Sequence, residues 1–131
     1  METITVSTSK KHELIDITDE VHNIVKESEV SEGICYIYVP HATAAVTINE
    51  NADPNIKEDI IKAINKMVPE HDNYLHDSID NNAAAHIKST LIGVSTHIPI
   101  SNGELQLGTW QSPMFVELDG PRQNRRIIVS V

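Results

Sequence analysis

Eight short stretches of the chain have the alternation or the β-branched composition of strands. In the first of them, Ile4 and Val6 are two positions apart and therefore lie on one face. The third is almost continuous in β-branched and aromatic residues and is predicted to be a central strand. The predicted strands span residues 2–8, 13–18, 33–39, 42–50, 94–100, 104–110, 114–120 and 125–131.

Turn residues separate some of these strands. Ser101-Asn102-Gly103 lies between the strands at 94–100 and 104–110, and Pro121 follows the strand at 114–120. Glycine, asparagine and proline favour tight reversals of the chain. Each of these two turns is therefore predicted to join its flanking strands as a hairpin.

Two further stretches have apolar residues at helical spacing. Residues 19–28 are predicted to be a short helix capped by Thr18 or Asp19. Residues 54–67 are predicted to be a helix that Asp53 caps and that has proline at its first position. The side chains of this second helix that are expected to face inward are Ile56, Ile60, Ile61 and Ile64.

A third helix is predicted over residues 83–93, with Asn82 as its cap and Gly93 at its end. It is apolar on nearly all sides, which is typical of a buried helix. The polar stretch at 69–82 before it has no period and is predicted to be a loop, where functional residues are often found. No repeat or linker divides the chain, so residues 1–131 are predicted to form one α+β domain, in which antiparallel β-sheets are wrapped around a central apolar helix.

Charge limits the classes of partner. The 131 residues carry 10 basic and 19 acidic side chains, a net charge of −9. Nucleic acids and anionic membranes need a basic surface, so neither is an expected partner. The chain has no apolar run of about 20 residues, no signal-peptide pattern at its start, and one cysteine. We expect a small cytoplasmic domain.

Three of the seven histidines have unusual positions. His41 follows a strand-ending proline, His76 lies in the polar loop, and His86 lies in the apolar helix, where an unpaired polar group costs free energy. Their imidazoles could converge on one ion, and three protein ligands with an open position are typical of catalytic zinc. No HExxH or CxxC motif supports this hypothesis, and ordinary hydrogen-bonded histidines are the alternative.

Other polar residues could bind a cation or a phosphate. Glu50 and Asp53 could hold magnesium, although Asp53 is also explained as a helix cap and Asn49 as a turn residue. Lys88 and Ser89 could contact a phosphate, although Ser89 is small enough to be a packing residue.

Two more candidates follow the later strands. Thr109, Trp110 and Gln111 end a predicted strand, and Trp110 could form a wall for a flat ring or belong to the core. Arg122 lies at the tip of the Asp119-Gly120-Pro121 turn, where it could reach a phosphate or be solvated.

Four segments in this order resemble the YjbQ-like family, described as secondary thiamine-phosphate synthases. They are HATAAVTINENADP at 41–54, NYLHDSID at 73–80, AHIKSTLIGVSTHIPI at 85–100, and GELQLGTWQ at 103–111. The resemblance implies β-sheets wrapped around a central helix and a homotrimer with sites near the subunit boundaries. Ser112-Pro113 departs from the family pattern and puts the local pocket wall in doubt.

The resemblance also implies an activity, which joins hydroxymethylpyrimidine diphosphate to thiazole phosphate and releases diphosphate. In that scheme His86, Glu50 and Lys88 are catalytic, and Lys88 with Arg122 contacts phosphates. The implied substrate-binding residues are Asn49, Asp53, Ser89, Thr109, Trp110, Gln111 and Arg122. The implied metal ligands are His41, His76 and His86.

The implied cofactor is a divalent metal, either zinc at the histidines or magnesium that enters with the diphosphate. Three imidazoles are typical ligands of zinc. A synthase that acts on a diphosphate is instead expected to bind its cation through oxygen ligands. The synthase activity could therefore be secondary. The alternative is a metal-binding trimer that acts as a hydrolase or binds a small phosphorylated ligand without turnover.

Overall fold

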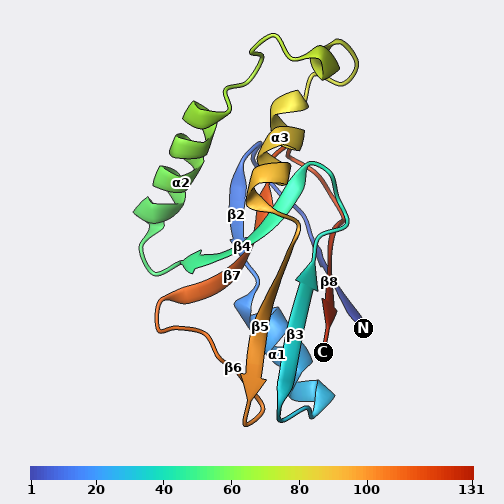
Figure 1. Cartoon of the computed structure of the whole chain (residues 1–131), viewed down its shortest axis with the longest axis vertical. Helices are drawn as coiled ribbons and strands as arrows, with labels where there is room; N and C mark the ends of the chain where they lie inside the picture. The colour runs from blue at the N-terminus through green and yellow to red at the C-terminus, as the bar shows by residue number, and fades with distance from the viewer.

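Two antiparallel sheets form the frame of the molecule, a computed structural model that describes residues 1–131 (Figure 1). The five-stranded sheet has the order β1 (Glu2–Val6), β8 (Arg125–Ser130), β3 (Gly33–Tyr38), β5 (Ser95–Ser101) and β6 (Glu104–Leu105). The three-stranded sheet has the order β2 (Glu13–Asp16), β7 (Gln111–Glu117) and β4 (Ala44–Glu50). The prediction of β3 as a central strand is confirmed.

The helices are α1 (Thr18–Ser28), α2 (Pro54–Met67) and α3 (Ala83–Ile92), and a short 3-10 helix, η1 (Leu75–Ser78), lies in the predicted loop. The order of strands and helices matches the sequence prediction. The start of α2 is also as predicted, since Asp53 Oδ1 accepts a hydrogen bond from the Asn55 N–H at 2.9 Å. None of the helices is long and apolar enough to cross a membrane.

The predicted cap of α1 is wrong. Ile17 occupies the cap position, and Thr18 is the first helical residue. Asp16 instead accepts the Thr18 N–H through Oδ1 at 2.8 Å. A carboxylate just before the helix therefore accepts one of the free N–H groups of the first turn, and neither Thr18 nor Asp19 acts as the cap.

The ends of α3 lie where they were predicted, but the predicted capping side chain makes no capping hydrogen bond. Asn82 occupies the cap position, but its side chain makes no capping bond, and Asp77 Oδ1 accepts the Ala83 N–H at 2.9 Å. Gly93 follows the helix with a φ of 98°, which favours glycine.

One predicted hairpin is confirmed and the other is wrong. β5 and β6 pair, with Ile100 opposite Leu105, although β6 has only two residues. β7 and β8 instead belong to different sheets. The connection between them, residues 118–124, contains the turn at Pro121 and crosses from one sheet to the other. A turn motif alone does not determine the partner of a strand.

Gly120 in this turn lies against another segment of backbone. A Cβ atom added there would be 2.2 Å from the carbonyl oxygen of Lys10. The turn therefore needs glycine because of close packing between the β1–β2 and β7–β8 connections.

Two apolar clusters lie on opposite faces of the three-stranded sheet. The larger one fills the space between the two sheets and α1, and it includes Phe115, Ile37 and Val21. The smaller one lies on the other face, beneath α2 and α3, and includes Ala45 and Met114. Strands β4 and β7 are therefore buried on both faces.

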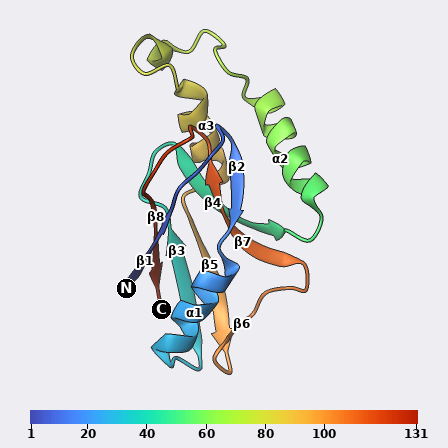
Figure 2. The same cartoon turned by 180° about the vertical axis from the view of Figure 1, so that it is seen from behind.

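The chain is α+β, with antiparallel sheets that curl and pack with three helices. Figure 2 shows α2 and α3 in the upper half of the molecule, near β2 and β4, and α1 at the opposite end. α3 buries Ala84, Ala85 and Ser89, whereas Ile87 and Leu91 on its far side are exposed. The central apolar helix is therefore packed against the sheet on one side and exposed to solvent on the other.

Candidate functional site

A pocket of about 350 Å³ lies between the middle and end of α3 and the segment that joins β3 to β4. We call it the histidine pocket, because His41 and His86 are two of its lining residues. The others are Ala42, Ser89, Thr90, Gly93 and Val94. Two of the three histidines selected from the sequence therefore share one cavity.

His41 is held by the backbone of β8. Its Nε2 accepts the Arg126 N–H at 2.9 Å, so the proton of the neutral ring is assigned to Nδ1. Burial lowers the pKa of His41, and the positive charges of Arg125, Arg126 and Arg122 lower it further. Both effects favour the neutral imidazole of His41, in which Nδ1–H is a hydrogen-bond donor.

His76 and His86 are in direct contact. Their rings meet edge to face, with centroids 4.8 Å apart. Nε2 of His76 is buried and has no hydrogen-bond partner, since Asp80 Oδ2 is 3.6 Å away. A buried polar atom without a partner calls for an explanation, such as a catalytic role or a bound ion or water.

The three histidines do not form a ready metal site within one chain. No three histidine, cysteine or acidic side chains are grouped closely enough to hold an ion. Nε2 of His41 already accepts the backbone N–H of Arg126, whereas Nε2 of His76 has no hydrogen-bond partner. The three-histidine site stays a prediction, and the residues of one chain do not fit it as they are arranged.

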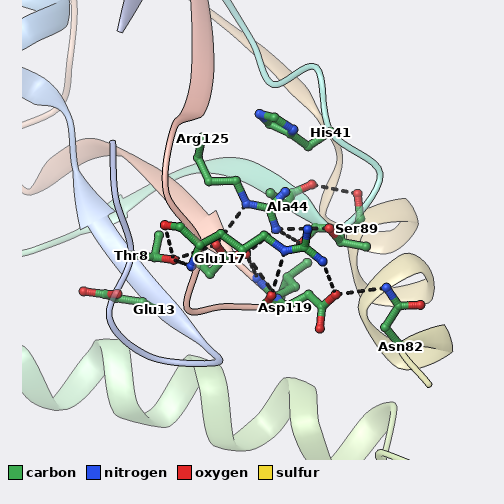
Figure 3. A network of polar contacts seen from close by, with 12 residues as sticks. Thr8, Glu13, His41, Ala44, Asn82, Ser89, Glu117, Asp119 and Arg125 are labelled. Carbon is green, nitrogen blue, oxygen red and sulfur yellow. Dashed lines mark hydrogen bonds and ion pairs between the residues drawn. The ribbon is translucent and has the colours of Figure 1, made fainter. Parts of the chain in front are cut away.

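A buried ion pair supports the segment that carries His41 (Figure 3). Arg125 Nε donates to Glu117 Oε1 at 2.9 Å, and both side chains are almost fully buried. Arg125 also donates to the Oγ1 of Thr43 at 3.0 Å, and Thr8 donates to Glu117 Oε1 at 2.8 Å. The network joins β7, β8 and the connection between β1 and β2 to Thr43, which is two residues from His41.

The Glu117 carboxylate is charged because of these contacts. Burial alone would raise its pKa, but the hydrogen bonds from Arg125 and Thr8 outweigh burial and lower the pKa. Sequence reasoning missed Glu117 and Arg125. The available signal was the Arg125-Arg126 pair at a strand start, because alternation turns one of two neighbouring side chains inward.

Lys88 is not in the histidine pocket. It is fully buried, and its Nζ donates to Asn65 Oδ1 at 2.7 Å and to Glu70 Oε1 at 3.0 Å. Residues two apart on a helix face different directions, so Lys88 and His86 cannot share one face of α3. The structure therefore connects Lys88 to α2 and the polar loop.

The neighbouring hydroxyls and Arg122 already have partners in the chain. Ser89 Oγ donates to the Ala44 carbonyl at 2.7 Å, and Thr90 Oγ1 donates to the His86 carbonyl at 2.9 Å. Arg122 is at the exposed turn and donates to Asp119 Oδ2 at 2.8 Å. The Ser89 hydroxyl thus attaches α3 to β4, as its packing interpretation predicts.

A second group of predicted residues lies at the far end of β4. Asn49 is opposite Ser112, and Glu50 is opposite Gln111. Trp110 is 65% exposed, so its interpretation as a core residue is wrong. We call these side chains the strand-end group, which comprises Asn49, Glu50, Asp53, Thr109, Trp110 and Gln111.

Pro113 does not interrupt β7. The strand begins at Gln111, and Pro113 lies within it opposite Ile48. Its carbonyl accepts the Ile17 N–H at 3.1 Å, so the residue still contributes an acceptor. The departure from the family pattern therefore leaves the strand-end group in register.

The histidine pocket and the strand-end group are separate within one chain. Ala44 accepts a bond from Ser89 in the pocket, and Glu50 is six residues further along β4. A strand rises about 3.3 Å per residue, which separates the two by about 20 Å. One chain therefore contains two groups of candidate residues at opposite ends of one strand.

Comparisons with known proteins agree on one family. A family model described as "UPF0047 protein YjbQ-like" matches residues 2–131. A UPF0047 protein of Methanocaldococcus jannaschii is 48% identical, over 90% of this chain and 84% of its own. YugU of Bacillus subtilis, also a UPF0047 protein, is 45% identical, over 93% and 92%.

Solved structures are similarly close. A protein of the YjbQ/UPF0047 family from Clostridium acetobutylicum, described as uncharacterized, has a TM-score of 0.95 and 44% identity, over 99% of this chain and 98% of its own. A YbjQ-like protein of unknown function from Sulfolobus solfataricus has a TM-score of 0.95 and 43% identity, over 98% and 92%.

Proposed function

Because this chain belongs to the YjbQ-like family, UPF0047, we propose that it is a transferase that joins hydroxymethylpyrimidine diphosphate to thiazole phosphate, forming thiamine phosphate and diphosphate. In this proposal the synthase activity is secondary to another reaction of the same site. The observation that carries the proposal is a histidine pocket in which the charge of Arg126, which has no acidic partner, acts on His41, in a chain of net charge −9. One local positive charge of this kind favours a phosphorylated small molecule over a nucleic acid or a membrane, which need an extended basic surface.

The reaction needs positive charge where the diphosphate departs. Arg126 supplies it next to His41, because its guanidinium makes no hydrogen bond or ion pair within the chain. His86 lies in the same pocket and can donate or accept a proton. Lys88 acts indirectly in this proposal, through the position of α3.

Magnesium enters this proposal with the diphosphate substrate. Glu50 and the free Oδ2 of Asp53 are oxygen donors of the type that magnesium prefers. Trp110 is exposed beside them and offers a flat apolar face for a ring. The strand-end group would thus bind the ring and cation end of a substrate.

The two groups form one site only if separate copies of the chain meet. We therefore propose a homotrimer in which the strand-end group of one copy faces the histidine pocket of the next. Three apolar side chains, each at least 64% exposed, support this assembly: Leu75 on η1, Ile79 directly after η1, and Leu91 on α3. A cluster of exposed large apolar side chains is typical of an interaction surface. In the same proposal the trimer acts in the cytoplasm.

The unpaired Nε2 of His76 favours a second candidate function. A zinc ion or a phosphate bound by the His76–His86 pair would make the chain a hydrolase or a small-ligand binding protein. The two candidates differ in one observable, which is the formation of thiamine phosphate from its two precursors.

Product formation by the purified protein tests the proposal. The wild type, His86→Ala and His22→Ala are each compared with magnesium, with zinc and after chelation. His22 is an exposed histidine of α1 and serves as the matched control. We expect turnover to fall at least about 100-fold in His86→Ala, the usual range for a lost general acid or base, and to persist in the control.

Two results would contradict the transferase proposal. One is the absence of product under every metal condition while the protein remains folded. The other is equal turnover in the wild type and His86→Ala, which would separate the activity from the histidine pocket. Bound zinc that is lost in His86→Ala, without any turnover, would support the binding function instead.

A further inference from the structure

Helix α2 is attached at its two ends and loosely packed between them. Before its start, the Asn51 amide donates to Asp16 Oδ2, and near its end Asn65 accepts from Lys88 at 2.7 Å. None of its own residues is fully buried, although its apolar side chains face the three-stranded sheet. Natural interiors have few voids larger than a water molecule, so this loose contact needs an explanation.

A cavity of about 130 Å³ lies beneath α2. It is separate from the histidine pocket and has no lining residue in common with it. β2, β4, β7, α2 and α3 all contribute to its wall. The lining residues are Leu14, Thr47, Asn49, Ile60, Ile64, Ile92 and Val116.

The wall combines aliphatic side chains with two polar groups. Five lining residues are aliphatic and none carries a charge, so an ionised phosphate would not be stable inside. Asn49 Oδ1 accepts the Glu50 N–H at 2.7 Å, which leaves the Nδ2 donor free. The Thr47 hydroxyl also has no partner within the chain. Thr47 and Asn49 are two residues apart on β4, so they belong to the same face of the sheet.

We infer that this cavity binds a single neutral heteroaromatic ring that carries a hydrogen-bond acceptor. An apolar cavity of about 150 Å³ binds benzene, so a cavity of this size accommodates one ring and not two. The aliphatic wall contacts the ring faces, and Asn49 Nδ2 or the Thr47 hydroxyl donates to the acceptor. The inference deepens the proposed function and rests on it for the natural ligand, namely one ring of a substrate whose phosphate remains outside.

Titration with 4-methylthiazole, pyrimidine and benzene tests the inference, with the methyl NMR signals of Leu14, Ile60, Ile64 and Ile92 as the readout. We expect saturable shifts of these signals with the two heteroaromatic rings. Ile64→Phe fills the cavity and is expected to weaken the binding of each ring at least tenfold. Ile56→Phe is the matched control, because Ile56 is a half-buried apolar residue of α2 that does not line the cavity.

Thr47→Val provides a second variant that preserves volume. It removes one hydroxyl, so it should weaken the binding of 4-methylthiazole or pyrimidine several-fold and leave that of benzene unchanged. The absence of saturable shifts with every ring, or unchanged affinity in Ile64→Phe, would overturn the inference. So would benzene binding as tightly as both heteroaromatic rings in the wild type.

Ring binding and turnover are separate measurements, so they distinguish a failure of the cavity inference from a failure of the transferase proposal. Turnover without ring binding beneath α2 would overturn the cavity assignment alone. Saturable ring binding without turnover would support the cavity as a ring site and contradict the transferase.

Discussion

At the scale of single residues, buried charges decide the geometry near His41. Glu117 and Arg125 are paired in the interior, and each has further hydrogen bonds to threonine. A buried pair of this kind adds little net stability, but it penalises the removal of one partner, because the other charge is left without compensation. The ion pair also holds the segment next to His41 in place, through the hydrogen bond from Arg125 to Thr43.

We predict that Arg125→Met lowers the free energy of unfolding by about 3–5 kcal/mol, because Glu117 would remain buried and unpaired. Arg126→Met is the control, since its side chain is exposed, and it should change stability by less than about 0.5 kcal/mol. Urea denaturation of both variants measures the difference. Equal stability of the two variants would contradict the structural role of the pair.

The lowered pKa of Glu117 predicts that the free energy of unfolding depends on pH. Its folded pKa is below the unfolded value of about 4.3, so the unfolded chain takes up a proton first as the pH falls. The stabilisation from Glu117 is therefore complete above pH 4.3 and is lost as the pH falls through the lower folded pKa. The stability gap between the wild type and Glu117→Gln should shrink over this range. A gap that is constant from pH 7 to pH 2 would contradict the prediction.

At the scale of elements, Lys88 connects α3 to α2 and to the polar loop. Its ammonium contacts Asn65, Glu70 and His12, which come from three separate segments. Burial and the Lys88 charge lower the pKa of His12, so the imidazole is neutral at pH 7. The contact of Lys88 with Glu70 thus attaches the loop that carries His76 to α3, on the side of the helix opposite to His86.

We predict that Lys88→Met accelerates amide hydrogen exchange in residues 69–82 and at the end of α2 at least tenfold. The core strands should exchange as they do in the wild type, because local opening need not involve the whole fold. Lys62→Met, at an exposed lysine of α2, is the control. Uniform acceleration across the chain would instead indicate a general loss of stability.

At the scale of the whole molecule, the separation of the two site groups is the main constraint. No side-chain motion bridges about 20 Å along β4, since β4 is hydrogen-bonded to β7 along its length. In the proposed homotrimer, the contact between copies would bring both groups to one substrate.

We predict that Leu91→Glu converts the proposed trimer to monomers, because it places a charge on the exposed apolar face of α3. Light scattering should then report 14.6 kDa in place of three times that mass. Asn23→Glu on α1 is the control and should remain assembled. A wild-type protein that is monomeric at micromolar concentration would contradict the trimer itself.

The local pattern of the chain was sufficient to predict the order and type of every main element. Alternation marked the strands, and Asp53 and Gly93 marked helix ends, because these signals depend on neighbours within a few residues. The family was also recognisable from motifs such as the NENADP and GTWQ segments.

Only the tertiary structure decided which segments meet. It assigned β7 and β8 to different sheets, connected Lys88 to α2, and placed Glu117 opposite Arg125. It also placed the strand-end group and the histidine pocket at opposite ends of β4. The physical reason is that such contacts depend on the packing of layers distant in sequence, whereas periodicity and turn motifs report only the local direction of the chain.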